Sequence, residues 1–446
     1  MPGGQSAEAV VLEGRSRSVH DTARARIALF GIFGIHNLGN ECTLQAMVHN
    51  VRGRLSNADL YTICYVPRDT ARRHAIAAVP VSSRRSSDTS LTRSKSTAAR
   101  WGRILFRRLP GEVREWLRAF RTLRGTDLVL MTGTGMLTDY SGSAAGYPYD
   151  VFKWTVAARL AGCKVRFVSI GVGPLYERLS RQLVRWALSL ADYRSYRDHV
   201  SKSRLEAVGF DTGKDRVFPD LAFSLPPSIL GDGAADRRPR RIVGLGVMNH
   251  QDKRAAGPGD PQASYRRYLS VMADFTVWLL DRGYGVRILQ GDAKHDGAAR
   301  RGLRATLERR GVRYDVAGIV DEDSTSVTEL LGQLALTDIV VSPRFHNLVL
   351  GLLLNKPVMS ISYDPKNDAL LEGFGLGHYC HRIDAPDVDQ LITQFVDLER
   401  HCAKGLPRLR ERAAEYRRLL DEQYRLILAD VRITSAPTHT SRRASH

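Results

Sequence analysis

The sequence predicts an α/β protein of two Rossmann-like domains that face each other across a cleft. Short apolar, β-branched segments alternate with helix-length amphipathic segments, as parallel strands alternate with crossover helices. Most of the expected strands end in Gly or a charged residue, which gathers ligand contacts at one edge of each sheet. A segment rich in Pro, Gly and Arg interrupts the alternation once, and the alternation then restarts.

A chain of 446 residues is long enough for two or three domains, and shifts in composition divide it. From about residue 68 to 109 the chain is rich in Arg and Ser and poor in large apolar residues, which predicts a mobile basic loop. The expected organisation is a flexible tail at 1–25, a first domain at 26–225 that contains the basic loop, a linker at 226–240, a second domain at 241–400, a basic helix at 401–433 that crosses back to the first domain, and a flexible tail at 434–446.

Charge and cysteine content restrict the functional classes. The formal net charge of +19 implies an acidic partner of one of three kinds: nucleic acid, an anionic membrane surface or a phosphorylated substrate. Five scattered cysteines without a Cys-x-x-Cys pair predict neither a zinc site nor a disulfide framework. No segment is apolar for long enough to cross a bilayer, and residues 1–21 lack the apolar core of a signal peptide, so we expect a cytoplasmic protein.

The first domain begins with an apolar strand at 27–33, a glycine-bearing turn and a helix that ends near Val51. Such an opening can bind a nucleotide or a phosphate at the helix start. Its spacing is not G-x-G-x-x-G, so a purely structural turn is the alternative. Candidates for the cleft lining in this turn are Asn37, Gly39 and Glu41. A second strand is expected at 60–66.

A helix is expected to begin at Pro110, with four apolar residues on one face: Val113, Trp116, Leu117 and Phe120. Its arginines, at 114, 118, 121 and 124, occupy other faces. We favour a helix that packs its apolar stripe on the sheet and exposes a basic back. The alternative is an element that lies on a membrane surface, attracted to anionic lipid.

The rest of the first domain continues the alternation. Strands are expected at 127–131 and 165–170, and glycines after each let the backbone approach a ligand: Gly133 and Gly135, then Gly171 and Gly173. Helices are expected at 150–160, 178–190 and 201–208. A short strand is expected to run into the charged turn at Arg197. The segment at 217–223 is expected to form a strand end with an acidic residue. In the second domain we expect strands at 242–247 and 285–290, helices at 265–282 and 327–335, and polar loops at 249–262 and 291–296.

Residues 337–367 carry the strongest candidate site. They predict a strand at 339–341, a polar turn with Arg344 and His346, a buried helix at 348–354, a strand at 358–362, and a second turn with Lys366. Both turns of such a βαβ unit open at the same edge of the sheet, near helix starts whose free N–H groups favour an anion. Each residue alone is compatible with a solvated charge or a structural histidine, and the joint placement favours an anion site.

Taken together, these motifs resemble the polysaccharide pyruvyl transferase family over roughly residues 27–375. The strongest part of the resemblance is Ser342-Pro343-Arg344-Phe345-His346 with Ser362-Tyr363-Asp364-Pro365-Lys366. Weaker parts are Asn37-Leu38-Gly39-Asn40-Glu41, Thr132-Gly133-Thr134-Gly135, Ser169-Ile170-Gly171-Val172-Gly173-Pro174, Tyr196-Arg197-Asp198 and Pro219-Asp220-Leu221-Ala222. The sequence departs from the family at Asn40, where Asp is usual, and at Phe345, where Leu is common.

The resemblance implies a GT-B-like fold and transfer of the pyruvate unit of phosphoenolpyruvate to two hydroxyls of a sugar. It implies that His346 and Arg344 are catalytic and that Arg197, Arg344 and Lys366 bind the donor, with Tyr363 and Asp364 in the cleft lining. A dianionic donor needs two cationic clamps, for which Arg is suited, and an imidazole can protonate its methylene carbon. We expect no metal and no cofactor besides the donor.

The expected partners are phosphoenolpyruvate and a sugar acceptor. The acceptors of the family suggest a lipid-linked glycan at the inner face of the membrane. Basic segments would then make peripheral contact with anionic lipid, and no nucleic acid is expected because no such motif occurs. One alternative is a GT-B glycosyltransferase that uses a nucleotide sugar. A second is a non-enzymatic protein that binds nucleic acid or membrane through its charge.

Overall fold

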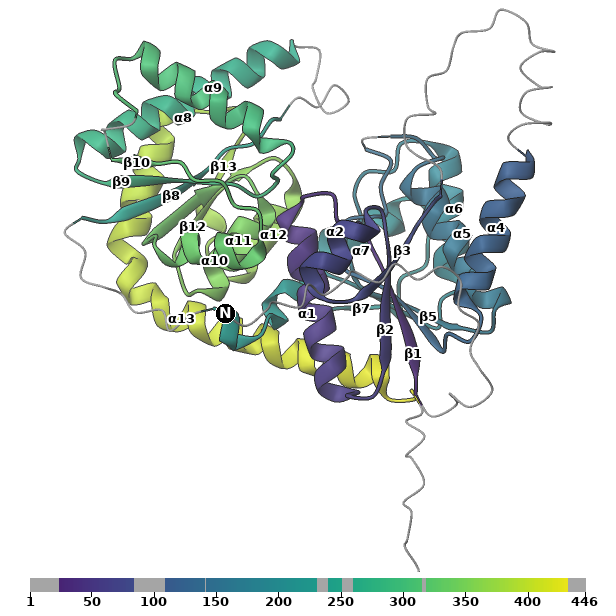
Figure 1. The fold of residues 1–446 in the computed structure, drawn as a ribbon. Coiled ribbons are helices and arrows are strands. Elements are labelled where there is room, and N and C mark those ends of the chain that lie inside the picture. The colour runs from purple at the N-terminus through teal and green to yellow at the C-terminus, as the bar shows by residue number, and fades with distance from the viewer. Residues whose placement is uncertain are drawn as a thin grey trace, which may run out of the picture.

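Two parallel β-sheets form two Rossmann-like domains, as the sequence predicts (Figure 1). The structure is a computed structural model that describes residues 24–83, 109–140, 142–230, 240–250, 260–314 and 318–431. Residues 1–23 of the predicted N-terminal tail, the predicted C-terminal tail, most of the predicted linker and residues 84–108 of the predicted basic loop lie outside the described residues. Within the described ranges every helix is too short or too polar to cross a membrane.

The N-terminal sheet has the strand order β3-β2-β1-β4-β5-β6-β7. Its strands are β1 Arg26–Phe30, β2 Asp59–Cys64, β3 Ala77–Pro80, β4 Leu128–Met131, β5 Lys164–Ile170, β6 Tyr193–Tyr196 and β7 Arg216–Val217. Its helices are α1 Leu38–Arg54, α2 Pro67–His74, α4 Leu109–Leu123, α5 Tyr147–Leu160, α6 Arg178–Ser189, α7 His199–Ala207 and the 3-10 helices η3 Leu221–Ser224 and η4 Pro227–Ile229. The direction of winding reverses between β1 and β4, which opens a crevice at the carboxyl ends of these strands.

The C-terminal sheet repeats this plan with the order β10-β9-β8-β11-β12-β13. Its strands are β8 Ile242–Gly246, β9 Gly285–Leu289, β10 Ile319–Val320, β11 Ile339–Ser342, β12 Val358–Ser362 and β13 Cys380–Arg382. Its helices are α8 Pro261–Asp281, α9 Asp296–Arg309, α10 Val327–Ala335, α11 Phe345–Leu353, α12 Pro365–Gly373, α13 Val388–Leu428 and the 3-10 helix η5 Gly377–Tyr379. β11 and β12 pair in parallel, so the turns after them open at one edge, as predicted.

Helix α13 has 41 residues and joins the two domains (Figure 1). It begins in the C-terminal domain at Val388, earlier than the predicted start at residue 401. It bends along its length, and its interior Pro407 supplies a reason, because proline cannot donate the helical hydrogen bond. Its last turns reach the N-terminal sheet, where the buried Gln423 accepts a hydrogen bond from Ser169 at 3.0 Å.

Aromatic rings tie the domains together beside α13. Phe223 of η3 stacks on Phe374 at a centroid distance of 5.7 Å and meets the edge of the α13 residue Tyr416 at 5.0 Å. One hydrophobic core runs through this contact, from the α1 side of the N-terminal sheet into the C-terminal domain. A second core lies on the other face of the N-terminal sheet. The domains are thus joined by packed apolar surface as well as by a covalent connection.

The prediction of a basic loop is wrong for its first part. Residues 67–74 form helix α2, and residues 77–80 form β3, which pairs in parallel with β2. Pro67 starts the helix, and Asp69 accepts a hydrogen bond at 2.6 Å from Arg73 on the same face, so the basic residues do not prevent a helix. The segment was missed because it is short and strongly polar.

The favoured interpretation of α4 is also only partly right. Val113 and Leu117 point to solvent, with exposed fractions of 52% and 45%, and Trp116 and Phe120 are half-buried. Fully buried positions of the helix are Glu115, Ala119 and Leu123. Glu115 can be buried because it accepts hydrogen bonds from Ser83 and Arg118. The apolar stripe of the sequence is therefore rotated away from the sheet.

Candidate active site

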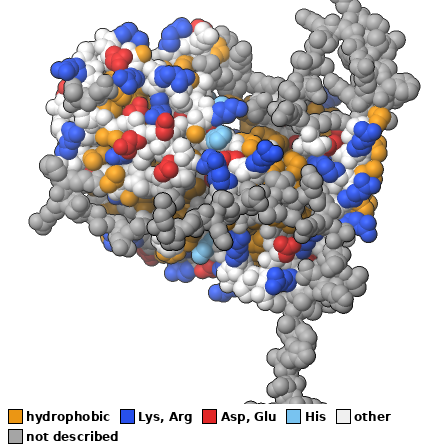
Figure 2. Space-filling view, viewed as in Figure 1, with side chains coloured by type: hydrophobic (Ala, Val, Ile, Leu, Met, Phe, Trp, Pro, Cys, Tyr) orange, Lys and Arg blue, Asp and Glu red, His pale blue; other side chains and the backbone are white. Residues whose placement is uncertain are grey.

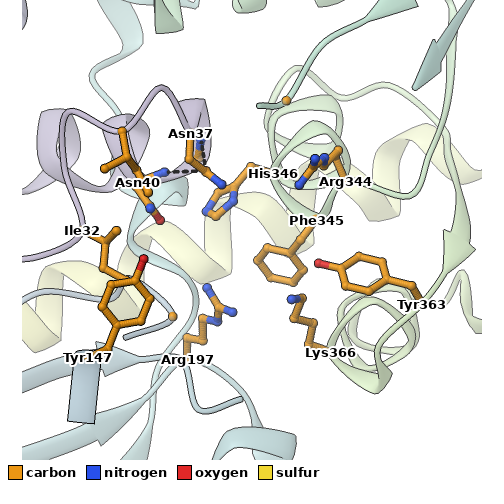
Figure 3. Close-up of a pocket in the computed structure, with 14 residues that line it drawn as sticks. Ile32, Asn37, Asn40, Tyr147, Arg197, Arg344, Phe345, His346, Tyr363 and Lys366 are labelled. Carbon is orange, nitrogen blue, oxygen red and sulfur yellow. Dashed lines mark hydrogen bonds between the residues drawn. The ribbon is translucent and has the colours of Figure 1, made fainter. Parts of the chain in front are cut away.

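A cavity of about 230 Å³ lies between the domains, at the edges where the strands of both sheets end (Figure 3). The N-terminal domain contributes Ile32, Ile35, Asn37, Gly39, Asn40, Gly135, Tyr147 and Arg197 to its wall. The C-terminal domain contributes Gly291, Arg344, Phe345, His346, Tyr363 and Lys366. Figure 3 shows the side chains of Arg197, His346 and Lys366 pointing from different elements toward one central space.

The turn between β11 and α11 holds two of these side chains in place. Arg344 is the N-terminal cap residue of α11, and His346 lies in its first turn. The Arg344 N–H donates to the Ser342 hydroxyl at 3.1 Å, and Asn367 of α12 donates to the Pro343 carbonyl at 2.9 Å. These bonds connect the two turns that the sequence predicts to meet. The result is a fixed backbone under a cationic and an imidazole side chain.

Arg344 is oriented by a buried carboxylate. Its Nε donates to Asp296 at 2.9 Å, and a second, shorter bond joins its terminal nitrogen to the same carboxylate. Asp296 is fully buried and also accepts from the N–H groups of Gly291 and Asp292. Burial lowers the pKa of Arg344, but Asp296 outweighs this effect and raises it. The guanidinium is therefore a permanent cation in the pocket wall.

Arg197 approaches the pocket from the end of β6. It forms an ion pair with Asp220 at 3.3 Å and lies over the Phe345 ring at 4.8 Å from the ring centre. It lies directly against Gly171, where a Cβ atom would be 2.6 Å from the guanidinium carbon. A glycine is therefore required at this position for the observed Arg197 conformation. Burial lowers the pKa of Arg197, and the carboxylates of Asp220 and Asp198 more than compensate and raise it.

His346 lies between Asp220 and the start of α1. Its Nε2 is 3.6 Å from the Asp220 carboxylate, longer than a hydrogen bond, as catalytic contacts often are before substrate binds. Its ring lies against Gly39, where a Cβ atom would be 2.0 Å from Nδ1. Burial would raise the pKa of Asp220, but His346 and Arg197 lower it to about 2. Asp220 is thus an anion that faces both the imidazole and the Arg197 guanidinium.

Lys366 completes the group of cations. It lies in the first turn of α12, and its ammonium is 4.8 Å from the centre of the Tyr363 ring. Asp364 caps α12 by accepting from the Lys366 N–H at 3.0 Å, and pairs with Arg204 of the N-terminal domain at 3.1 Å. Burial would raise the pKa of Asp364, but Lys366 and Arg204 lower it. Asp364 therefore positions the turn and connects the domains.

The sequence-based candidates divide into two groups. The pocket brings together Arg197, Arg344, His346, Lys366, Asn37, Gly39, Gly135 and Tyr363. Glu41, Gly133, Gly171, Gly173 and Asp364 are not part of the wall of this cavity. Glu41 is buried against His74 and the Gly34 N–H, Gly171 lies behind Arg197, and Gly133 and Gly173 lie against Ser169 and Thr138. These residues shape the structure around the pocket.

The sequence analysis did not name as site residues two carboxylates behind the wall, Asp220 and Asp296, or six members of the wall: Ile32, Ile35, Asn40, Tyr147, Gly291 and Phe345. Asp296 and Asp220 act on arginines that are distant in the sequence, so no local pattern identifies them. Asp220 does follow the short strand β7, and its place at a strand end is a signal that could have been used. No group of three or more potential ligands (His, Cys, Asp, Glu) is arranged to hold a metal ion among the described residues.

Comparison with known structures identifies the fold. A UDP-GlcNAc 2-epimerase from Neisseria meningitidis, bound to UDP-GlcNAc, is 10% identical and has a TM-score of 0.54, over 89% of this chain and 98% of that one. An Anabaena protein in complex with UDP and glucose is 11% identical, with a TM-score of 0.52 over 90% of this chain and 99% of that one. At these identities the similarity shows a GT-B fold, as expected, and nothing further.

Sequence comparison identifies the family. The family model described as polysaccharide pyruvyl transferase matches residues 37–365, a range that contains every residue of the pocket wall except Ile32, Ile35 and Lys366. No curated protein matches the chain significantly.

Proposed function

Because the chain belongs to the polysaccharide pyruvyl transferase family, we propose that it transfers the pyruvate unit of phosphoenolpyruvate to two hydroxyls of a sugar. The product is a cyclic pyruvate ketal, and phosphate is released. The acceptor is a precursor of an exopolysaccharide or another cell-surface glycan. Phosphoenolpyruvate is the donor substrate, and the proposal requires no separate cofactor.

The observation that carries the proposal is the convergence of three cations and an imidazole around one small cavity: Arg197, Arg344, Lys366 and His346. Phosphoenolpyruvate has two anionic groups, a carboxylate and a phosphate ester, both attached to its central carbon atom. Arginines bind either group through paired hydrogen bonds, and a lysine acts as a compact positive charge. The cavity volume of about 230 Å³ suits a small donor better than a nucleotide sugar.

In the proposed reaction, His346 donates a proton to the methylene carbon of the donor, which becomes a methyl group. The central carbon becomes electrophilic, and the first sugar hydroxyl adds to it while losing its proton to a base. The bond between the central carbon and the phosphate oxygen then breaks, and phosphate leaves beside Lys366. The second hydroxyl adds to the same carbon, gives up its proton to the released phosphate, and closes the ketal. Arg344 and Arg197 stabilise the donor's negative charges throughout.

The N-terminal wall of the cavity is suited to the acceptor. It presents an aromatic ring, two amides and two isoleucines: Tyr147, Asn37, Asn40, Ile32 and Ile35. Amide groups can bind sugar hydroxyls, and an aromatic ring can pack on the apolar face of a sugar. In this arrangement the acceptor hydroxyls approach the donor from the N-terminal domain.

A GT-B glycosyltransferase that uses a nucleotide sugar is the alternative function, since the solved structures with this fold include complexes with UDP-GlcNAc and UDP. Thermal unfolding with added ligand separates the two. We expect phosphoenolpyruvate to raise the Tm and UDP-GlcNAc to leave it unchanged. A shift with UDP-GlcNAc alone would favour the alternative.

Substitution of the imidazole tests the chemistry. His346→Asn should still bind phosphoenolpyruvate, because the cations remain, but should lose at least about a hundredfold in acceptor-dependent phosphate release. The assay uses phosphoenolpyruvate with candidate membrane glycolipids, and mass spectrometry detects the added ketal. Unchanged phosphate release in His346→Asn would exclude its proposed role.

A further inference from the structure

Exposed apolar side chains are concentrated in one part of the molecule. Of the eleven large apolar side chains that are exposed among the described residues, eight lie between residues 113 and 190. They include Leu160, Leu179 and Trp186, with exposed fractions of 69%, 57% and 48%. Single exposed apolar residues are ordinary on a soluble protein, whereas a concentration of them marks an interaction surface.

Six of these eight side chains lie on one layer of helices or at its end; the other two, Tyr140 and Tyr176, lie in loops. Helices α4, α5 and α6 pack side by side on one face of the N-terminal sheet (Figure 1). An aromatic row crosses all three: Trp116 of α4 meets Phe152 of α5 at 6.3 Å, and Phe152 meets Trp186 of α6 at 5.7 Å. We call this surface the α4–α6 face and define its apolar members as Val113, Leu117, Leu160, Leu179, Trp186 and Leu190.

The exposed charges that accompany the apolar residues of the α4–α6 face are positive, and the acidic residues of its helices accept hydrogen bonds from neighbouring side chains. Exposed arginines accompany the apolar residues: Arg114, Arg121, Arg178 and Arg181. Helix α6 contains no acidic residue. The acidic residues of the other two helices accept hydrogen bonds from neighbouring side chains: Glu112 from Tyr149, Glu115 from Ser83 and Arg118, and Asp150 from Tyr65. Figure 2 shows blue and orange side chains alternating along the right edge, where Figure 1 places α4.

We propose that the α4–α6 face binds the surface of a membrane that contains anionic lipid. Leucines and a tryptophan can enter the boundary between headgroups and acyl chains, where aromatic rings are favoured. Arginines between them can pair with lipid phosphates, and a negatively charged surface attracts them. A lipid surface fits this pattern better than a folded protein, because the apolar residues are dispersed over three helices and are accompanied by exposed arginines.

The α4–α6 face lies near the pocket, so a membrane bound to this face would lie near the candidate site. Helices that follow parallel strands begin at the edge where the strands end, and α5 begins with Tyr147, which lines the pocket. One edge of the α4–α6 face, at the start of α5, therefore adjoins the N-terminal wall of the cavity. A membrane bound there would hold a lipid-linked glycan close to the site, although the binding itself does not depend on the reaction.

Co-sedimentation of the full chain with lipid vesicles tests the proposal. We expect binding to vesicles of phosphatidylcholine with phosphatidylglycerol, and much weaker binding to phosphatidylcholine alone. The double variants Leu117→Ser with Trp186→Ser and Arg121→Glu with Arg178→Glu should each lower the partition coefficient by at least about tenfold. Each variant's Tm would verify that it folds.

Matched pairs on other surfaces provide the controls. Leu336→Ser with Leu426→Ser removes two apolar side chains, each 43% exposed, and Arg408→Glu with Arg410→Glu reverses two exposed charges of α13. Both control pairs should bind vesicles like the original protein. The proposal is overturned if the original protein does not bind anionic vesicles, or if the control pairs lose as much binding as the test pairs. Because lipid binding is measured directly, failure of pyruvyl transfer would leave the result unaffected.

Discussion

Asp220 links the two functional side chains that face it across the pocket's base. The carboxylate is buried and contacts Arg197 from its own domain and His346 from the other. A buried carboxylate that contacts both side chains orients both of them. Asp220 is thus a positioning residue, while His346 and Arg197 contact the donor in the proposed reaction.

We predict a pH-dependent loss of stability in Asp220→Asn. The pKa of Asp220 is lowered from 3.8 to about 2, so its ionised form stabilises the folded state above the unfolded pKa, and this contribution is lost as the pH falls toward 2. At neutral pH the variant should lose about 2 kcal/mol in the free energy of unfolding. Urea unfolding between pH 7 and pH 2 would measure the difference, which should shrink below about pH 4.

The exposed Asp281 gives a control for this experiment. Asp281→Asn should change the free energy of unfolding by less than about 0.5 kcal/mol at each pH. A deficit in Asp220→Asn that stays constant down to pH 2 would show that the carboxylate's charge is not the source of the stabilisation.

Gly39 allows a second prediction at the same scale. A Cβ atom there would be 2.0 Å from His346 Nδ1, so Gly39→Ala must displace the imidazole or the start of α1. We expect turnover to fall about a hundredfold, because small displacements of a reacting group cost that much. Gly53→Ala, in the same helix with no atom within 4 Å, should retain full turnover and gain about 0.5–1 kcal/mol of stability. Phosphate release and urea unfolding measure both, and equal turnover in the two variants would contradict the argument.

Among the elements, α13 shows how one helix can stabilise a two-domain arrangement. Near its end, the Arg166 guanidinium bonds to the Ile427 carbonyl and to Asp430, and Arg54 pairs with Asp421. Gln423 accepts from Ser169 and donates to Ser195 at 2.8 Å in a buried position. Polar groups buried this deeply need their partners, so these bonds specify where the helix ends on the N-terminal sheet.

We predict that neighbouring positions of α13 differ in their contribution to stability. Gln423→Ala leaves the buried Ser169 and Ser195 hydroxyls with fewer partners and should cost roughly 1–3 kcal/mol. Glu422→Ala removes an exposed ion pair with Arg216 and should cost less than about 1 kcal/mol. Chemical denaturation gives both values. Similar costs for the two variants would mean that the buried bonds do not hold the helix in place.

The sequence predicted the elements whose pattern is local and strong. The strand, turn and helix around Arg344 follow from a β-branched run, Pro343 and an apolar segment, and the structure has them as β11 and α11. Helix α2 was missed because eight residues with four basic side chains give little periodicity. The orientation of α4 was missed because a buried Glu115 depends on Ser83 and Arg118, which a helical pattern does not reveal.

At the scale of the whole molecule, the domains share one core. Apolar residues of α1, η3, α11 and α13 belong to a single buried cluster that extends across both sheets. The ring contacts of Phe223 with Phe374 and Tyr416 lie in this connection. Separating the domains would expose this surface to water, so their arrangement is stabilised by the same hydrophobic effect that stabilises each domain.

We therefore predict a single cooperative unfolding transition. Fluorescence, which reports on Trp154 in the N-terminal domain and Trp278 in the C-terminal domain, should give the same midpoint as calorimetry. Phe223→Ala should lower the midpoint and reduce the free energy of unfolding by about 3–5 kcal/mol. Because it weakens the contact between the domains, we expect their transitions to separate in this variant. Two transitions in the unmodified protein would contradict the prediction.

The candidate site was predictable to the extent that its residues follow strand ends. Arg344, His346 and Lys366 were expected at one edge of one sheet, and they meet there. Arg197 was identified through the family resemblance, and its closeness to the others depends on how the domains pack. Asp220 was noted in a motif but given no role, and Asp296 was not singled out, because both act through tertiary contacts with arginines. Sequence thus indicates the charged groups that line the pocket more readily than the groups that orient them.

Because the site is divided between two domains, substitutions far from the cavity are expected to affect it. Arg197 and Asp220 belong to one domain, and Arg344, His346 and Lys366 to the other, so a substitution far from the cavity that alters the angle between the domains changes every distance across it. Helix α13 joins the two domains, so a change in α13 is expected to alter the reaction rate even when the side chains of the cavity are unchanged. Altered reaction rates in variants of α13 with intact folds would be evidence of misalignment rather than of lost chemistry.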